Sequence, residues 1–576
     1  MKLKKFLVTS ALPYANGRVH IGHLAGAYLP ADIFVRWLRL KGHEVHFVCG
    51  SDEHGIPITL TALKRKSTPQ QVVDEFHAAN GEAFAAAGID FDIWGRTSSP
   101  EHHALTQQFF ARLFDRGFIE KRVTQQLYSE KSQMFLPDRY VEGECPFCHD
   151  PNARGDQCDK CGKTYEATEL KNPRVAIDGD GSTPVLRNTA HWFLKLDAFS
   201  ERLKSWVATH AEGSKEPWRL NAQREATSWL TRGLHARAIT RDTAWGVEIP
   251  LSDPDVQGKR LYVWFDAPIG YVTFTQQLFA KEGTPECWKE FWQNPECEIV
   301  NFIGKDNIPF HTITWPGMQI GANEAVPPGE APYQLVSQVV SNEFLNLGED
   351  KFSKSRGNII EIGWFVEKFG RESLRYYLTA VAPEGSDSTF TWDDYVQRYN
   401  GELADILGNY IHRVTTFAVN KLGAVVPTPG ELTGAHAAFV AETKTALSTV
   451  GALLDAYQFR NAITTVISSA RAGNVYFDAN APWKSIKSDP AECNRLIYVC
   501  LCRAAALGLM LRPFLPKSAE AVLKNFGLAE PFAPGSASLQ AEDVVKPGAA
   551  ILKPEVLFKK LEPKDLPEEI QQPAKK

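Results

Sequence analysis

Residues 10–24, SALPYANGRVHIGHL, join a strand to a helix, and this junction constrains the fold more than any other feature of the chain. The apolar residues 5–9 predict a buried strand, and Asn16-Gly17 predicts a turn after it. Helical spacing then places apolar residues on one face up to Gly42: Leu24, Tyr28, Ala31, Val35 and Leu38. Because the first N–H groups of a helix lack intrahelical partners and the dipole end is positive, this junction predicts an anion-binding site.

His20 and His23 stand at the start of this helix, with Gly22 between them. Residues three apart share one helix face, so both imidazoles are expected beside the anion site. Gly22 has no side chain and would let a flat ring lie against the backbone. The alternative is a solvated helix cap, since the pattern HxGH is short and not specific by itself.

The composition fits a large soluble protein. The 576 residues predict three or four domains at roughly 150 residues each. A net charge of −5 neither requires nor excludes a nucleic-acid partner, because phosphate contacts need only a local basic face. No run approaches the roughly 18 apolar residues of a membrane helix, and the lysine-rich start makes a poor signal peptide that runs into the histidine motif. We therefore expect a cytoplasmic protein with no membrane partner.

Strand and helix patterns alternate through much of the N-terminal half, which predicts an α/β fold with a doubly wound parallel sheet. Residues 44–49 form a second expected strand that ends in GSDEHG. Ligands bind beyond the carboxyl ends of such strands, so Asp52 is placed to meet the ammonium of a small substrate, with a solvated loop carboxylate as the alternative. The alternation stops near Gly117, returns near Arg260, and continues with strands at residues 298–303 and 334–340.

Four cysteines lie in the interrupting segment, residues 118–235, as Cys145-Pro-Phe-Cys148 and Cys158-Asp-Lys-Cys161. Two such CxxC knuckles bring four thiolates together tetrahedrally, which predicts a closed structural Zn²⁺ site with no open position for catalysis. Iron is the alternative metal. His149 and His191 are not needed to complete the coordination shell, and we expect them to be surface or packing residues.

Two further segments carry candidate binding residues. Residues 260–271, RLYVWFDAPIGY, offer an aromatic wall for a flexible uncharged side chain, although aromatic residues at this spacing also occur in cores. Gly304-Lys-Asp306 follows a strand, where an acid is well placed for ribose hydroxyls. Residues 348–357, GEDKFSKSRG, predict a mobile cationic loop able to close over a polyphosphate, with a charged surface hairpin as the alternative.

From about Asp393 to Phe526 the pattern is helical, with one apolar stripe formed by Leu403, Ile406, Leu407, Tyr410, Val414 and Phe417. Asn409 and Arg413 lie off that stripe, four residues apart. Ala481-Pro482-Trp483 begins another helical segment. Polar and aromatic residues of these types read single-stranded RNA, but an exposed polar pair and a partly buried tryptophan would look the same. Residues 526–576 contain seven prolines and predict a partly ordered wrap or tail.

HIGH at residues 20–23 and KFSKS at residues 351–355 occur in this order, about 330 residues apart. The pair resembles the HIGH and KMSKS signatures of class I aminoacyl-tRNA synthetases. Within that class the chain resembles the methionyl-tRNA synthetases of the bacterial type with one CxxC–CxxC metal knob. The residues that carry this likeness are ALPYANGRVHIGH, GSDEHG, the CxxC pair, YVWFDAPIGY, FIGKDNIPFH and KFSKSRGN. About 140 residues between the sheet halves leave no room for the editing insertion of the isoleucine, valine and leucine enzymes.

The resemblance assigns roles to residues of this sequence. It implies catalytic roles on the ATP triphosphate for His20, His23, Lys351 and Lys354. It implies an ATP-binding role for Gly22 at the adenine, for Gly304 and Asp306 at the ribose, and again for Lys354 at the phosphates. It implies a methionine site formed by Leu12, Tyr14, Asp52, Trp264, Ala267, Pro268, Tyr271 and His311. It places the anticodon-reading positions at Asn409, Arg413 and Trp483, and the structural zinc on Cys145, Cys148, Cys158 and Cys161. Phe352 departs from the signature methionine.

The resemblance also implies the reaction and the partners. Methionine would react with ATP, accompanied by Mg²⁺, to give methionyl-adenylate and pyrophosphate, and would then be transferred to elongator and initiator tRNA(Met). The carboxylate nucleophile is already ionised at pH 7, so no general base is needed. Some members of the family continue into a dimerising tRNA-binding barrel, and the C-terminal region here is short, so a monomer is expected unless the chain is a truncated form of a dimeric enzyme.

The resemblance implies a division of the chain into six parts. Residues 1–117 and 236–341 form the two halves of a Rossmann-like catalytic domain, and residues 118–235 form the zinc-binding insertion between them. Residues 342–392 form the KFSKS loop and stem-contact region, 393–525 an all-α anticodon-binding domain, and 526–576 a tail.

Three other functions stay open. A cysteinyl enzyme is comparably short, a non-catalytic tRNA-binding paralogue would keep the helical domain, and a small-molecule nucleotidyltransferase would share HxGH but would not need the helical half.

Overall fold

Five strands form one parallel sheet whose order is β14-β13-β1-β2-β3. The strands are β1 (Lys5–Ser10), β2 (Glu44–Ser51), β3 (Ile93–Arg96), β13 (Cys297–Gly304) and β14 (Gln338–Asn342). The computed structural model describes residues 3–566 except 137–139, 156–157, 159, 162, 164, 177–180, 216 and 349–358. The strand order reverses between β1 and β13. Ligands bind outside the carboxyl ends of the strands at such a switch point, and we call this region the crevice.

Side chains of β1 alternate between two apolar cores, one on each face of the sheet. Phe6 and Val8 enter the first core, whereas Leu7 enters the second. The first face is covered by α2 (Leu29–Leu40) and α13 (Arg371–Ala380). The second is covered by α5 (Pro100–Asp115), α9 (Gly270–Lys281) and α11 (Trp315–Ala322). Burial on both faces explains the nearly continuous apolar strands, and the predicted doubly wound sheet is confirmed.

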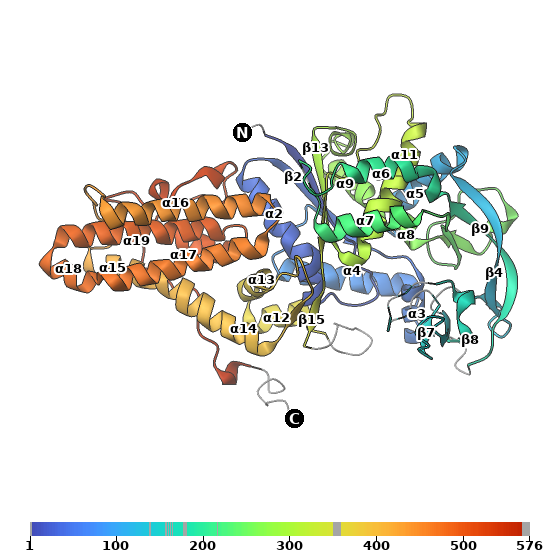
Figure 1. Cartoon of the computed structure of the whole chain (residues 1–576), viewed down its shortest axis with the longest axis horizontal. Coiled ribbons are helices and arrows are strands. Elements are labelled where there is room, and N and C mark those ends of the chain that lie inside the picture. The colour runs from blue at the N-terminus through green and yellow to red at the C-terminus, as the bar shows by residue number, and fades with distance from the viewer. Residues whose placement is uncertain are drawn as a thin grey trace.

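The segment between the sheet halves is built on a long antiparallel pair, β4 (Ile119–Ser129) and β9 (Val185–Leu194). Its smaller elements are β5 (Met134–Phe135), β6 (Val141–Glu144), β7 (Ala153–Arg154), β8 (Lys171–Val175) and β10 (Arg237–Ala238). The knob formed by β6, β7 and β8 lies at the end of the molecule opposite the C-terminal helices (Figure 1). Two helices, α6 (Ser200–Ala208) and α7 (Leu220–Arg232), return the chain to the sheet.

Two strand predictions need correction. The pattern near Arg260 does not extend the parallel sheet, because β12 (Lys259–Leu261) pairs antiparallel with β11 (Thr240–Asp242) as a separate two-stranded sheet. The predicted strand at residues 334–340 starts at Gln338 and ends at Asn342. Residues just before it make isolated backbone contacts, such as Gln334 N–H to the Trp292 carbonyl at 2.7 Å, instead of a ladder. Apolar content alone could not distinguish a strand of the parallel sheet from an antiparallel strand or from an extended loop.

The C-terminal half is a helical bundle that extends away from the sheet (Figure 1). Its helices are α14 (Trp392–Arg398), a π-helix at Tyr399–Gly408, α15 (Asn409–Lys421), α16 (Gly434–Asp455), α17 (Phe459–Asn480), α18 (Pro482–Ser488), α19 (Pro490–Leu511) and α20 (Pro516–Lys524). The predicted apolar stripe is confirmed, because Leu403, Leu407, Tyr410 and Val414 are buried while Ile406 and Phe417 pack partly against the same core. The core of the first sheet face continues into this bundle.

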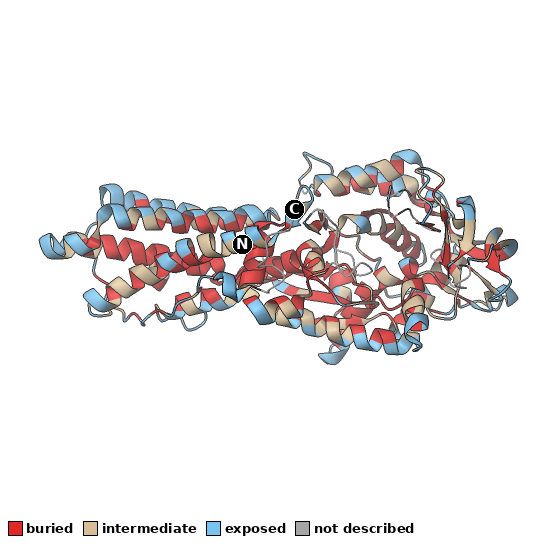
Figure 2. Cartoon of the chain, turned by 90° about the horizontal axis from the view of Figure 1, so that it is seen from below, coloured by how far each residue is buried: buried red, intermediate tan, exposed pale blue. Residues whose placement is uncertain are grey.

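α19 is the one helix among the described residues that could cross a membrane by length and apolar composition, but 89% of its apolar window is buried inside the protein. Figure 2 shows that a buried helix runs through the middle of the bundle between exposed helix faces. The described residues beyond α20 pack back onto the bundle. The Leu561 N–H donates to Asn400 Oδ1 at 2.8 Å, and Phe558 lies against Gly408.

Candidate active site

The chain after β1 lies beside the end of β2, and this contact builds the floor of the crevice. The Ala15 N–H donates to the Asp52 carbonyl at 2.8 Å, and the Asp52 N–H donates to the Pro13 carbonyl at 2.9 Å. Tyr14 is therefore held next to Asp52 as an isolated parallel bridge. Asp52 is only 3% exposed, so it is not a solvated loop carboxylate. Burial, followed by the charge of Asp266, raises the pKa of Asp52 well above its ordinary value.

His20 and His23 cap the first helical turn, α1 (Ile21–His23), with their own side chains. The Gly22 N–H donates to His20 Nδ1, the His20 N–H donates to His23 Nδ1, both at 3.2 Å, and the ring centroids are 3.8 Å apart. The residues that follow the 349–358 segment lie against this turn, because the Ile21 N–H donates to the Ile360 carbonyl at 3.0 Å. Both imidazoles therefore stand at the positive end of a helix, as the motif predicts.

A π-helical turn, Leu24–Tyr28, separates α1 from α2 and was not predicted. Its carbonyl groups accept bonds from the sheet: Ser10 Oγ donates to the Ala27 carbonyl at 3.0 Å, and Asn342 Nδ2 donates to the Gly26 carbonyl at 2.7 Å. Widened turns of this kind are often found at functional sites. Periodicity could not reveal the turn, because the side chains from β1 and β14 that hold it are distant in sequence.

Aromatic side chains line the crevice above Asp52. Trp264 Nε1 donates to the Tyr14 hydroxyl at 2.7 Å, and its ring centroid lies 4.1 Å from that of Phe310. Trp264 is 40% exposed, so it is not a core residue, whereas Tyr271 and Pro268 are buried. Ala267 is half-buried beside them. Leu12 reaches the same wall, since a Cβ on Gly270 would lie 3.2 Å from Leu12 Cδ1.

His311 closes this wall from the π-helix Phe310–Thr314. Its Nδ1 lies 3.0 Å from the Asn307 carbonyl, and its Nε2 lies 2.9 Å from the Tyr271 hydroxyl. A carbonyl only accepts hydrogen bonds, so the ring proton is assigned to Nδ1 and Tyr271 donates to Nε2. Burial lowers the pKa of His311 to about 4, which keeps this imidazole neutral.

Gly304 ends β13 at the same edge of the sheet, and Asp306 lies in the short 3-10 helix Lys305–Asn307 that follows. A Cβ at Gly304 would lie 2.8 Å from Asp306 Oδ1, so glycine lets this carboxylate fold back against the strand end. Asp306 is exposed and available to a ligand. Lys305 between them is occupied elsewhere, in ion pairs with Glu343 at 2.8 Å and Asp387 at 2.7 Å. Lys351 and Lys354, the two predicted lysines of the KFSKS segment, lie outside the described residues.

Under the crevice lies a group of buried and half-buried side chains to which the sequence assigned no role. His54 Nδ1 contacts Asp266 Oδ2 at 2.6 Å, and His54 Nε2 contacts His103 Nε2 at 3.3 Å. Asp266 is completely buried, and its Oδ1 has no hydrogen-bond partner among the described residues. Asp266 lies in the segment WFDAPIGY, His54 in GSDEHG and His103 in α5, and no periodicity or spacing brings these three residues together.

The four cysteines of the knob form one cluster whose sulfur atoms all lie within 4.8 Å of one another, and they are the single such cluster of metal-ligand type found in the described part of the chain. Sγ of Cys145 lies 3.8 Å from Sγ of Cys161, and Sγ of Cys148 lies 3.6 Å from Sγ of Cys158. Tetrahedral coordination with bonds of about 2.3 Å requires sulfur separations of about 3.8 Å, so the cluster fits a four-thiolate metal ion.

Neither histidine near the knob belongs to this cluster. His149 is exposed and contacts Glu144 at 2.6 Å through Nδ1. His191 is buried in β9, where its Nδ1 contacts Thr240 Oγ1 at 2.9 Å. The predicted surface and packing roles of these two residues agree with their places in the structure.

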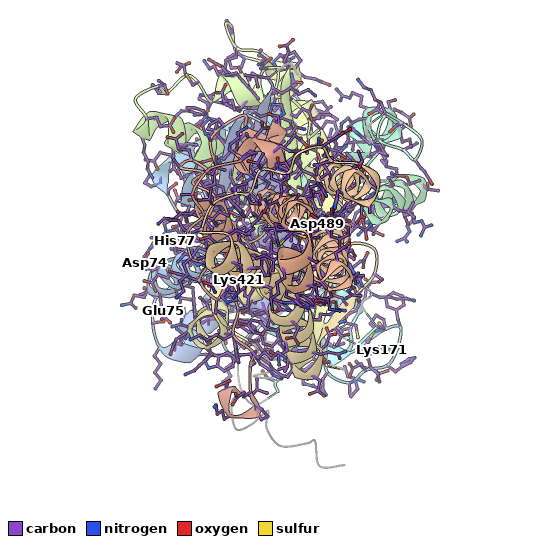
Figure 3. The ribbon with its side chains drawn as sticks, turned by 90° about the vertical axis from the view of Figure 1, so that its left-hand side faces the viewer. Asp74, Glu75, His77, Lys171, Lys421 and Asp489 are labelled. Atoms are coloured by element: carbon purple, nitrogen blue, oxygen red, sulfur yellow. The ribbon has the colours of Figure 1, made fainter. Side chains whose placement is uncertain are left out.

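At the far end of the bundle, Arg413 and Trp483 share one neighbour, Phe477. The guanidinium of Arg413 stacks 5.1 Å from the Phe477 centroid, and Trp483 packs edge-on at 6.1 Å. Trp483 is 46% exposed, and Asn409 is exposed one turn before Arg413. Arg413 also pairs with Asp478 at 2.5 Å, a contact that the sequence did not predict. Figure 3 looks onto this end of the bundle, with Lys421 of α15 and Asp489 before α19 near the centre of the view.

A parallel sheet with a histidine-capped helix at its switch point, an inserted metal knob and a helical C-terminal bundle defines a class I aminoacyl-tRNA synthetase. In agreement, residues 6–415 match the profile of tRNA synthetases class I (M), and residues 426–572 match the anticodon binding domain of methionyl tRNA ligase. The chain is 44% identical to the methionine–tRNA ligase of Pyrococcus abyssi over 97% of its own length and 76% of that protein. It is 42% identical to that of Chlorobaculum tepidum over 98% of its length and 80% of the relative.

The chain therefore belongs to the methionyl-tRNA synthetase family, and its activity is the ligation of methionine to tRNA. The same fold occurs in a solved structure of Mycobacterium tuberculosis methionyl-tRNA synthetase in complex with methionyl-adenylate. That protein is 24% identical, has a TM-score of 0.77, and is matched over 96% of this chain and 100% of the other.

Proposed function

We propose that the crevice at the switch point of the sheet activates methionine with ATP and then transfers it to tRNA(Met). The observation that carries this proposal is that the histidine pair at a helix start, Asp52 and the Trp264 wall all follow or contact the carboxyl ends of the neighbouring strands β1 and β2. An anion site and an ammonium site on one crevice match a reaction between a nucleotide and an amino acid.

In the first step the methionine carboxylate attacks the α-phosphorus of ATP, and pyrophosphate leaves. No general base is required, because the carboxylate is ionised at pH 7. His20 and His23 stabilise the triphosphate, and Lys351 and Lys354 stabilise the charge that develops on the leaving group. Gly22 leaves space for the adenine, while Gly304 and Asp306 bind the ribose. If ATP binds with Mg²⁺, the ion would neutralise part of the phosphate charge.

The methionine site follows from the crevice wall. Asp52 binds the ammonium, and the remaining residues enclose the thioether chain: Leu12, Tyr14, Trp264, Ala267, Pro268, Tyr271 and His311. A neutral His311, held by Asn307 and Tyr271, lets this end of the pocket accept an apolar chain without burying a charge. One methylene in such a pocket discriminates by only about 1–3 kcal/mol, so shape alone limits specificity.

Cys145, Cys148, Cys158 and Cys161 hold a structural Zn²⁺. Four thiolates complete the tetrahedral shell, so this ion would supply folding energy to the knob and no open position for a reactant. Iron fits the same distances and is the alternative metal.

Asn409, Arg413 and Trp483 read the tRNA anticodon. An exposed indole beside a guanidinium that stacks on Phe477 offers planar surfaces for unstacked bases, and Asn409 offers amide hydrogen bonds. Elongator and initiator tRNA(Met) would both be substrates, since both would present the anticodon CAU. We propose that the enzyme acts as a monomer in the cytoplasm.

Amino-acid-dependent exchange of pyrophosphate into ATP, measured without tRNA for all twenty amino acids, tests the first step. We expect exchange with methionine alone. Exchange with cysteine would assign the chain to the neighbouring cysteinyl function. No exchange with any amino acid would overturn the proposed activation step and favour a tRNA-binding protein without catalysis.

A further inference from the structure

Two carboxylates are buried at the floor of the crevice without a cation. Asp52 is 3% exposed and Asp266 is 0% exposed. Among the described residues, neither forms an ion pair with lysine or arginine, and the Asp266 contact is to the imidazole of His54. Asp52 accepts one long hydrogen bond, from the His54 N–H at 3.5 Å. Arg96, at the end of the neighbouring strand β3, is already bound to both oxygens of Glu53 at 2.9 and 3.0 Å.

The imidazoles around these carboxylates supply no positive charge. Burial lowers the pKa of His54 and of His103 to about 4 and that of His102 well below its ordinary value, so all three imidazoles are neutral near pH 7. The remaining titratable or charged groups that face this region from neighbouring elements are Glu53, Arg96, His77, Glu248, Arg260, Cys49, Tyr14, Tyr271 and His311. Figure 3 shows His77 beside Asp74 on α4 (Pro69–Ala86), at the edge of the molecule.

Ionising two neighbouring carboxyl groups in one buried site requires a large free energy. Ionising one carboxylate without a cation is already unfavourable, and ionising the second adds repulsion. Burial raises the pKa of Asp266, and burial with the charge of Asp266 raises that of Asp52. Burial and the lack of a cation therefore both favour a proton on this pair of carboxyl groups, and the unpartnered Oδ1 of Asp266 is one place for it.

A bound ammonium changes this balance, because it brings the missing positive charge next to Asp52. We propose that methionine binding releases a proton from the Asp52–Asp266 pair, so that the ammonium is bound by two carboxylates that carry the charge together. The inference depends on the proposed methionine site. In this exchange the protonated pair and the methionine zwitterion give the bound zwitterion, the ionised pair and a proton in solution, and no other bond is formed or broken.

His54 is the positioning residue of this pair. It holds Asp266 through Nδ1 and supports Asp52 through its backbone N–H, so one residue connects the ammonium end of the site to the segment that carries Trp264. Its Nε2 faces His103, which is half-buried on α5. The nitrogen contacts can be kept with the Asp266 proton present or absent, because each neutral imidazole both donates and accepts.

Calorimetric titration of methionine into the protein, in two buffers of different ionisation enthalpy near neutral pH, counts the protons. We expect release of about one proton for each methionine bound. Because the free site holds a proton that the complex lacks, affinity must weaken as the pH falls, by about tenfold for each pH unit across the titration. Equal binding heats in both buffers, with an affinity that does not change with pH, would overturn the inference even if no variant folds.

Asp266→Asn tests the pair. Removing the second carboxylate lowers the pKa of Asp52, so the pH at which affinity begins to weaken should move down and proton release at neutral pH should fall toward zero. Glu248→Gln is the matched control, since it removes an exposed carboxylate near His103 and should keep the wild-type proton count. An unchanged count in Asp266→Asn would overturn the role of Asp266.

These measurements distinguish a failure of the proposed function from a failure of the present inference. If methionine produces neither binding heat nor pyrophosphate exchange, the proposed function fails. If methionine binds and supports exchange but releases no proton, only the present inference fails.

Discussion

Arg375 Nη2 lies 2.7 Å from Asp32 Oδ2, and both side chains are completely buried. The same guanidinium donates to the carbonyls of Phe514 at 2.7 Å and Pro513 at 3.1 Å. Asp32 belongs to the helix that follows the histidine motif, whereas Phe514 follows the core helix of the bundle. One arginine therefore joins the catalytic sheet to the helical bundle, in the core that the two share.

Arg375→Met should strongly destabilise the protein, because it leaves the buried Asp32 with Arg36 as its remaining cation and removes the arginine donor from the carbonyls of Phe514 and Pro513. Breaking a buried ion pair from one side typically costs 3–5 kcal/mol. Urea unfolding would measure the change in free energy. Arg398→Met is the control, since Arg398 forms partly exposed pairs within one helical region and should cost no more than about 1 kcal/mol. Equal losses in both variants would contradict the special role of Arg375.

The same pair predicts an acid dependence of stability. Burial acts to raise the pKa of Asp32, but the guanidinium groups of Arg375 and Arg36 outweigh it and lower the pKa below its ordinary value of 3.8. A carboxylate with a lowered folded-state pKa contributes stability that is present above 3.8 and is lost as the pH falls through the folded pKa. Unfolding free energies measured from neutral pH downward should therefore fall less steeply in Asp32→Asn than in the wild type.

His23→Gln should reduce methionine-dependent pyrophosphate exchange by about 100-fold, the usual cost of one lost transition-state donor of about 3 kcal/mol. Glutamine keeps the capping bond from the His20 N–H, so the loss should occur without a change in melting temperature. His235→Ala, at an exposed histidine away from the crevice, is the control. Wild-type exchange in His23→Gln would show that the imidazole does not act on the nucleotide.

Cys158→Ser should abolish metal binding, because Cys158 is buried and supplies one of four sulfur atoms that must converge. Elemental analysis should find about one zinc for each wild-type chain and almost none in the variant. Cys287→Ser, a half-buried cysteine outside the cluster, should keep its zinc. Finding iron in the wild type would show that the bound metal is iron and not zinc. A full zinc content in Cys158→Ser would show that Cys158 is not a metal ligand.

Trp483→Ala should lower kcat/KM for tRNA by about 10- to 100-fold, which corresponds to the 1–3 kcal/mol of one stacked base. Pyrophosphate exchange should not change, since Trp483 belongs to α18, which lies at the end of the bundle away from the parallel sheet (Figure 1). Trp483→Phe keeps an aromatic face and should retain most of the tRNA activity. If both variants behave like the wild type, Trp483 does not contact the anticodon.

Much of the crevice could be predicted because its parts are local in sequence. Periodicity located the strand before the histidine motif and the helix after it, and the rule that ligands bind at the carboxyl ends of parallel strands placed Asp52 and Asp306 at one edge. The two CxxC knuckles predicted the metal cluster through spacing alone. The errors, at residues 259–261 and 334–337, lie in short segments whose apolar content fits a parallel strand, an antiparallel strand or an extended loop equally well.

The sequence by itself determined the parallel sheet, the position of the histidine pair and the four thiolates, because each depends on residues close together in the chain. Only the tertiary structure decided which charges are compensated. Asp266 contacts His54, which lies 212 positions away in the sequence, and Asp32 pairs with Arg375, in a helix that follows the second half of the sheet. Local patterns carry no information about such pairs, since the electrostatic state of a buried carboxylate depends on the cations and donors that long-range packing brings beside it.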